Sequence, residues 1–378
     1  MAHSIRLHKG IPRVNIRPKM PNRSTTPPHQ STNLVVCKWV FRIKRLPDGS
    51  IDKYKARLVA KGFHQRPGLD VNNAFLQGHL SENAYIAQPP SIEVLTTSSG
   101  VLLTQRRYIF DLLARTKMFG AKPIATPLVT DGNLILHSGI ALTNYTKYKT
   151  LVGSLQYLYL THPDLSYVVN KLSQFMHRPT SEHWIAAKRL LQYMCGTLTH
   201  GLFLHKANTF SLHAFSDANW ARNKDDYISM GAYIVYLGCH PISWSSKKQR
   251  TVARSSIEAE YRLVAATTSE INWICSLVTE LGITLPTLPI IYCDNVGATY
   301  LYSNPVFHSR MKHVAIDYHF IRDQVQSDAL RVTHVSSADQ LVNTLTKPFS
   351  RSCFQEVASK NYESRLASSP ELHLEGAY

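Results

Sequence analysis

The chain has 378 residues, of which 44% are hydrophobic, a fraction that excludes a wholly disordered protein and allows two or three domains. Its 42 Lys and Arg residues outnumber its 25 Asp and Glu residues and give a net charge of +17 at pH 7. Because such an excess suits a polyanion, we expect a nucleic acid as partner; the plain alternative is that the charge serves solubility alone.

The six cysteines lie far apart, and none forms a Cys-X-X-Cys pair. This spacing argues against a zinc site or a disulfide framework and fits a reducing compartment. Four of them lie in apolar runs and are expected to be small buried hydrophobic residues: Cys37, Cys239, Cys275 and Cys293. The sequence has no long apolar run and starts without a signal-peptide core, so we expect a soluble, intracellular protein with no membrane partner.

The residue pattern changes twice in the N-terminal third, from polar and basic to β-rich and then to helical. Residues 1–33 are rich in Pro, Ser, Thr, Asn and basic side chains, which predicts a flexible basic leader. Two β-rich runs then flank a Pro-Asp-Gly turn and predict a hairpin: VVCKWVFRIKR and IDKYKARLVAKGF. Farther on, the apolar spacing of VLLTQRRYIFDLLARTKMFG predicts a helix. We group residues 34–122 as one region.

A second region is assigned to residues 123–202. It begins with a connector rich in Pro and Thr and continues as a helical stretch from about Tyr148 to Leu198. Pro163 and Pro179 are expected to break this stretch, because proline cannot continue a helix.

The third region, residues 203–350, alternates differently. Three runs are predicted to be successive strands: FSLHAFSDANW, MGAYIVYLG and HPISWSSKK. A long amphipathic helix ending at Gly282 comes next, followed by a strand, two helices, a strand and a closing helix. This order predicts an α/β (α+β) domain, a mixed sheet covered by helices. Residues 351–378 are polar and weakly patterned, and we expect a disordered tail.

Three groups of acids lie at similar places in this third region. Asp217 lies in or at the edge of the first strand, Glu258 and Glu260 begin the long helix, and Asp294 ends an apolar strand. A carboxylate at the end of a buried strand is costly unless it is compensated, and divalent metal supplies that compensation in phosphodiester hydrolysis. The plain alternative is that the strand-end aspartates cap the helices that come next.

Five motifs occur in order through this region: FSDANWA, ISWSSKKQRTVARSSIEAEY, YCDNVGA, KHVAIDYHFIRD and HVSSADQLVNTLTKP. Together they closely resemble the ribonuclease H domain of copia-type LTR retrotransposon polyproteins. The segment before them resembles that family's connection region, and KWVFRIKRLPDGSIDKYKARLVAKGFHQRPG resembles the fingers of its polymerase. The resemblance implies a ribonuclease H-like five-stranded mixed sheet with helices, preceded by an incomplete reverse transcriptase.

The resemblance also implies an Asp-Glu-Asp-Asp set that holds two Mg²⁺ or Mn²⁺ ions. Asp217 matches its first member and Asp294 its third. Glu260 fits the second better than Glu258, because Tyr261 would then face the core, and two residues separated by one position on a helix cannot point at one site.

The fourth position departs from the family pattern. Relatives are expected to have Gln-Leu-Ala-Asp where this chain has Gln-Leu-Val-Asn343, so a neutral amide replaces a carboxylate and divalent binding should weaken. Asp339 lies one helical turn earlier and is a weak candidate for a substitute. His334 matches a histidine that aids product release in relatives, or is an ordinary polar residue at a strand end.

The polymerase part departs further. Asp70 stands where the first of three catalytic aspartates is expected, but the Tyr-Val-Asp-Asp turn that supplies the other two occurs nowhere in the sequence. Two abrupt junctions in this part resemble losses of tens of residues relative to the family. Lys55 and Arg57 resemble fingers residues that bind nucleotide phosphates, yet they have no reaction to serve. We therefore expect polymerase activity to be lost.

Three hypotheses remain open on the sequence. The first is a magnesium-dependent nuclease that cuts RNA in RNA–DNA hybrids at a weakened site. The second is a non-catalytic binder of nucleic acid that grips phosphates through Lys247, Lys248 and Arg250, a group that is otherwise a solvated turn. The third is a decayed pseudogene product that folds only in part.

Overall fold

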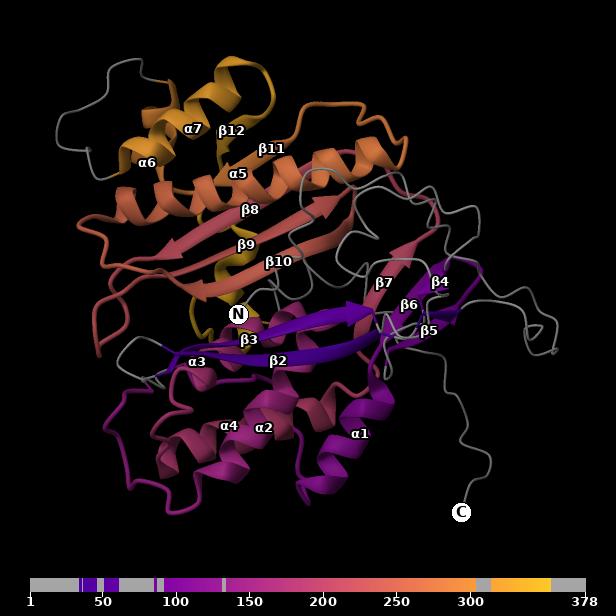
Figure 1. Cartoon of the computed structure of the whole chain (residues 1–378), viewed down its shortest axis with the longest axis vertical. Coiled ribbons are helices and arrows are strands. Elements are labelled where there is room, and N and C mark those ends of the chain that lie inside the picture. Colours follow the sequence, from indigo (N-terminus) through magenta and orange to yellow (C-terminus); the bar gives the residue numbers. More distant parts are fainter. Residues whose placement is uncertain are drawn as a thin grey trace, which may run out of the picture. The chain divides into compact units, whose positions relative to one another are not determined.

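The computed structural model describes residues 34–35, 37–45, 51–60, 85–86, 92–130, 134–303 and 314–354, with the first four ranges described by backbone alone (Figure 1). The predicted leader at 1–33, Asp70, and most of the predicted tail (355–378) lie outside these ranges. The chain forms two compact units, residues 1–90 and 91–378, which are described separately. The finer boundaries at 122, 202 and 350 stay predictions.

The first unit contains the predicted hairpin. Strand β2 (Cys37–Arg45) pairs antiparallel with β3 (Ile51–Ala60), which confirms it. Strand β2 is rich in β-branched and aromatic residues, which favour a pleated backbone, whereas β3 has fewer of them. Two short strands, β1 (Leu34–Val35) and β4 (Tyr85–Ile86), pair in parallel.

The second unit begins with a three-stranded sheet in the order β5-β6-β7. Its strands are β5 (Glu93–Thr96), β6 (Gly100–Thr104) and β7 (Gly201–His205). The helix predicted across VLLTQRRYIFDLLARTKMFG is wrong at its start, since α1 covers only Arg106–Arg115. Residues of β6 instead alternate between buried and half-buried and pair antiparallel with β7, a partner about a hundred positions away in sequence.

A group of helices comes next, and its breaks are those predicted. They are α2 (Tyr145–Tyr157), α3 (Ser166–Ser173) and α4 (Ser181–Gly196), with 3₁₀ helices η2 (Leu158–Leu160) and η3 (Pro163–Leu165) between α2 and α3. Pro163 opens η3 and Pro179 precedes α4, as expected for a residue without a backbone N–H. Their apolar faces, with α1, form one core rich in leucine.

The third region forms the predicted mixed sheet, in the strand order β10-β9-β8-β11-β12. Strands β8, β9 and β10 are antiparallel neighbours, whereas β11 runs parallel to both β8 and β12. The strand bounds are β8 (Leu212–Asn219), β9 (Met230–Leu237), β10 (His240–Lys248), β11 (Ile290–Cys293) and β12 (Arg331–His334). The expected five-stranded mixed sheet is confirmed.

Helices cover this sheet. The long helix α5 (Ser256–Glu280) lies along one face, with α6 (Val296–Ser303) and α7 (Ala315–Gln326) beside it (Figure 1). The Ser255 side chain caps α5 by accepting the Glu258 N–H. The predicted closing helix is the 3₁₀ helix η5 (Leu341–Leu345), whose Val342 and Leu345 pack on the opposite face of the sheet.

The helical group is joined to the sheet through Tyr159. Its carbonyl accepts the indole N–H of Trp244 at 3.1 Å, and its hydroxyl accepts the backbone N–H of Ser246 at 2.9 Å. Both partners belong to β10, so the helical group covers that strand of the sheet. Within the described part of the chain, every helix is too short or too polar to cross a lipid bilayer.

Candidate metal centre

The two aspartates predicted from strand ends lie on neighbouring strands. In the parallel pairing of β8 with β11, Ser216 lies opposite Cys293. Asp217 and Asp294 are the next residues along each chain, and the carboxyl ends of parallel strands meet at one edge of a sheet. The register therefore places these two side chains at the same edge.

Glu260 joins this edge from the first turns of α5. Its Oε1 atom accepts the backbone N–H of Ala218, the residue after Asp217, at 2.9 Å. Glu258 turns the other way, where it accepts the backbone N–H of Arg254 and forms an ion pair with Arg262. The structure therefore separates the two glutamates and places Glu260 with the aspartates. Tyr261 faces the core as expected and is fully buried.

The three carboxylates repel one another in a buried setting. Burial raises the pKa of Glu260 well above its usual value, and the charges of Asp217 and Asp294 raise it further. Burial and Asp294 also raise the pKa of Asp217. A divalent cation bound between clustered carboxylates offsets the repulsion between their negative charges, and carboxylate oxygens are ligands that such cations prefer. The residues present therefore fit such a cation: Glu260 and Asp294 have oxygens within 4.8 Å of each other, and the charge of Asp217 acts on Glu260 from the same edge of the sheet.

Two hydrogen bonds and one charge from the C-terminal segment act on the aspartates, and the sequence reasoning missed all three. Thr346 donates a hydrogen bond from its hydroxyl to Asp217, and Lys347 lies near enough to lower the pKa of that carboxyl. Ser337 donates from its hydroxyl to Asp294 at 2.8 Å. The available signal for Thr346 and Lys347 was the Thr-Lys-Pro run, which begins three residues after the fourth position of the motif.

Asn343 contacts the two residues that hold the aspartates. Its Nδ2 atom donates to the carbonyl of Ser337, and its backbone carbonyl accepts the hydroxyl of Thr346. The Asn343 side chain is buried, and no described residue donates a hydrogen bond to its Oδ1 atom. Asp339, the weak candidate for a substitute, is exposed.

Cys293 belongs to the same cluster. It is buried, as predicted, whereas Cys239 and Cys275 are only half-buried and the Cys37 side chain lies outside the described residues. One donor atom each from Glu260, Cys293 and Asp294 lie within 4.8 Å of one another. Burial and the charge of Glu260 raise the pKa of the Cys293 thiol, so it is neutral in the free protein. Sequence reasoning took this residue only as an apolar side chain.

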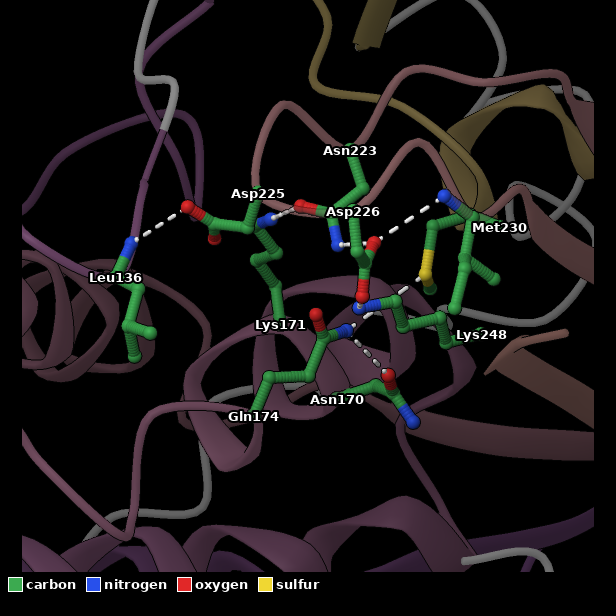
Figure 2. Close-up of polar contacts among 10 residues, drawn as sticks. Leu136, Asn170, Lys171, Gln174, Asn223, Asp225, Asp226, Met230 and Lys248 are labelled. Carbon is green, nitrogen blue, oxygen red and sulfur yellow. Dashed lines mark hydrogen bonds and ion pairs between the residues drawn. The ribbon is translucent and has the colours of Figure 1, made fainter. Parts of the chain in front are cut away.

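The predicted phosphate-gripping residues differ in their surroundings. Figure 2 shows Lys248 against Asp226, which also accepts the amide of Asn223, while Asn223 in turn accepts Lys171 of α3 at 3.1 Å. Lys248 is thus engaged in a network that joins the helical group to the sheet. Lys247 is half-buried, and burial lowers its pKa, whereas Arg250 is exposed.

The remaining candidates are His334, on the strand beside Cys293, and three residues of the polymerase part. His334 ends β12 as an exposed residue, paired in register with Cys293. Lys55 and Arg57 belong to β3, of which only the backbone is described, and Asp70 lies outside the described residues.

The chain is similar to polyproteins of plant retrotransposons, while no family model matches it. The Pol polyproteins of transposons RE1 and RE2 from Arabidopsis thaliana are each 46% identical over 468 residues, covering 88% of this chain and 32% of the relative. The Pol polyprotein of transposon TNT 1-94 from Nicotiana tabacum is 27% identical, covering 84% of this chain and 35% of the relative.

Among solved structures, the N-terminal RNase H domain of Rv2228c from Mycobacterium tuberculosis is 14% identical, covering 41% of this chain and all of that one, with a TM-score of 0.27. LC11-RNase H1 in complex with an RNA/DNA hybrid is 7% identical, covering 34% of this chain and 88% of that one, with a TM-score of 0.27. TM-scores this low carry no argument about the relationship of this chain, which rests on the sequence identities.

The length of the matched span is itself informative. The alignment with the RE1 polyprotein extends over 468 positions, whereas this chain has 378 residues, so at least 90 positions of the relative have no counterpart here. The chain spans about a third of the length of these curated relatives. The chain belongs to the copia-type retrotransposon Pol polyprotein family.

Proposed function

We propose that the chain carries a ribonuclease H site that cuts the RNA strand of an RNA–DNA hybrid. The observation that supports this most is the meeting of Asp217, Glu260 and Asp294 at one edge of the sheet, where burial and mutual repulsion raise the pKa of the first two. A divalent cation, Mg²⁺ or Mn²⁺, relieves that repulsion. Two ions are the number that the family ancestry implies.

Hydrolysis requires water to attack phosphorus while the bond from phosphorus to the ribose O3′ breaks. A divalent cation at this edge would lower the pKa of that water and neutralise charge on the phosphate oxygens. The chain's own part is to hold the three carboxylates still. Ala218 holds Glu260, Thr346 holds Asp217 and Ser337 holds Asp294, each through one hydrogen bond. Such outer contacts keep ligands oriented without reorganisation.

Asn343 favours a second candidate, a non-catalytic binder of nucleic acid. Its amide removes one negative charge from the fourth position and is fixed to the Ser337 carbonyl. Fewer carboxylates mean weaker divalent binding. In that case the net charge of +17 still attracts the phosphates of a hybrid or another nucleic acid. A decayed product that folds only in part is the remaining candidate.

We also propose that the polymerase activity of the ancestor is lost. A Tyr-Val-Asp-Asp turn is absent from all 378 residues, which leaves Asp70 without the two other aspartates of a polymerase site. One carboxylate cannot hold the pair of ions that nucleotide addition needs.

The nuclease proposal is tested with the full chain, Mg²⁺ and an RNA–DNA hybrid labelled on the RNA strand. We expect slow cleavage that falls at least about a hundredfold in Asp217→Asn and Glu260→Gln, since even outer partners of metal ligands cost 10- to 100-fold. Glu258→Gln is the matched control, because it lies on the same helix and faces Arg254 and Arg262. Binding of the hybrid without cleavage would instead support the non-catalytic binder. The absence of both binding and cleavage would support the decayed product.

A further inference from the structure

Cys293 places a sulfur atom among the carboxylates. Its thiol donates a hydrogen bond to Oε2 of Glu260 over a distance of 3.8 Å, and Asp294 brings a third donor atom within 4.8 Å of a donor atom of each. In a tetrahedral zinc site, sulfur at about 2.3 Å and oxygen at about 2.1 Å from the metal lie about 3.6 Å apart. The separation between Cys293 and Glu260 is therefore close to what a shared zinc-like ion requires.

A second observation comes from α6. The hydroxyl of Tyr302 is buried, with 6% of the residue exposed, and no described residue forms a hydrogen bond with it. Cys293 and Glu260 both act electrostatically on this hydroxyl, so it lies beside the same donors. A buried hydroxyl without a partner costs about 1–3 kcal/mol, and it indicates a missing polar group at this point.

The donor chemistry selects the class of cation. Mg²⁺ takes oxygen ligands in octahedral geometry and keeps several waters, whereas Zn²⁺ and Cd²⁺ accept thiolate together with carboxylate. Three protein donors that leave a fourth position open are a common zinc arrangement.

We propose that Glu260, Cys293 and Asp294 form a binding site for a thiophilic divalent cation of the zinc class. Binding replaces the thiol proton, which is released to solvent, by a bond from sulfur to the metal. Because Glu260 and Asp294 also belong to the carboxylate cluster, this cation and Mg²⁺ exclude each other. The site needs no hydrolysis to exist, and so it stands apart from the nuclease proposal.

The test uses Cd²⁺ as probe on the full, reduced, metal-free chain. Thiolate ligation of Cd²⁺ gives an ultraviolet charge-transfer band, and we expect this band to saturate in the wild type. Cys293→Ser should lose it and weaken Cd²⁺ binding by more than about tenfold. The matched control is Cys275→Ser, because Cys275 is a half-buried thiol near the C-terminal end of α5. Retention of the band in Cys293→Ser would overturn the proposal.

Folding of the variants is controlled by thermal unfolding, which also gives a second readout. A cation that binds only the folded state raises Tm with its concentration. Cd²⁺ should raise the Tm of the wild type and of Glu258→Gln, and raise it much less in Glu260→Gln and Cys293→Ala. Excess Mg²⁺ should weaken Cd²⁺ binding in the wild type. Equal Tm shifts in all four proteins would refute the site, whereas Cd²⁺ binding by a chain that never cuts RNA would refute only the nuclease.

Discussion

Asn343 is held in place by a bond that an aspartate could not make. Its Nδ2 atom donates to the Ser337 carbonyl at 3.0 Å, whereas a carboxylate at that point would face the carbonyl oxygen with a like partial charge. The Oδ1 atom of Asn343 meanwhile accepts nothing from any described residue. Compared with an aspartate, the neutral amide adds no negative charge to the carboxylate cluster, so it stabilises the metal-free protein and weakens the attraction of the cluster for a cation.

Asn343→Asp is therefore expected to trade stability for metal binding. Without divalent ions its free energy of unfolding should fall by about 1–3 kcal/mol, the cost of a buried polar group that loses its partner. Mg²⁺ should restore most of that loss and accelerate hybrid cleavage. Thermal unfolding with and without Mg²⁺ checks the first part, with Asn343→Ala as the control that Mg²⁺ does not rescue. The same Mg²⁺ shift in Asn343→Asp and wild type would remove residue 343 from the site.

The three acids of the proposed site were predicted from the sequence, and the residues that form hydrogen bonds with them were not. Strand-end position, helix frame and family motif together indicated Asp217, Glu260 and Asp294. Thr346 reaches Asp217 across 129 positions of sequence, a contact that only the folded chain creates. Cys293 was hidden for another reason, because an apolar neighbourhood predicts burial equally well for a structural thiol and for a ligand.

At the scale of elements, α4 depends on an unusual cap. The Nδ1 atom of His183 accepts the Thr180 backbone N–H at 3.0 Å, and Nε2 donates to the Ile135 carbonyl at 3.1 Å, which requires the neutral ring. Burial lowers the pKa of His183 below 6.5, while Asp225 and Glu182 oppose that change and Lys171 adds to it. Protonation at Nδ1 would replace the acceptor by a donor and break the cap.

The lowered pKa of His183 sets the sign of the pH effect. The cap contributes fully above the unfolded pKa of 6.5 and is lost as the pH falls through the lower folded value. His183→Gln keeps an acceptor at the third helical position, so its stability should depend less on mildly acidic pH. Urea unfolding midpoints over that range measure the difference. If the urea midpoint changes with pH equally in the two proteins, the role of the cap is contradicted. Burial also lowers the pKa of His162, so we expect some loss of stability at acidic pH in both proteins.

Element types were predicted well where periodicity is local. The strands β8 to β10, the long helix α5 and the breaks at Pro163 and Pro179 all arise from patterns within a few residues. The run before α1 misled the prediction because Val101 to Thr104 owe their extended form to β7, which their own neighbours in sequence do not reveal. Long-range pairing overrides local apolar spacing in such a segment.

At the scale of the molecule, β6 and α1 belong with the helical group that comes after them in the chain. Ile109, Leu112 and Leu113 of α1 are buried in the same core as α2, α3 and α4. Burying each such side chain stabilises the fold by about 1.5–3 kcal/mol, which is a large share of the stability of a typical domain.

A fragment of residues 91–354 should therefore unfold cooperatively, whereas one of residues 123–354 should be far less stable. The shorter fragment lacks the partner strand of β7 and three core side chains from α1. Circular dichroism during thermal unfolding compares the two, and protease resistance provides a second measure. If the shorter fragment melts at the same temperature, the predicted boundary at residue 122 is a real one.

The position of Tyr159 has a consequence for the sheet as a whole. An outermost strand with free N–H groups can recruit a strand from another molecule, and this is how many β-rich proteins begin to aggregate. By accepting the Ser246 N–H, the Tyr159 hydroxyl occupies one of the places where such a guest strand would attach. The helical segment thereby blocks this part of the β10 edge against pairing with another copy, and the five-stranded sheet without that segment would expose the edge to solvent.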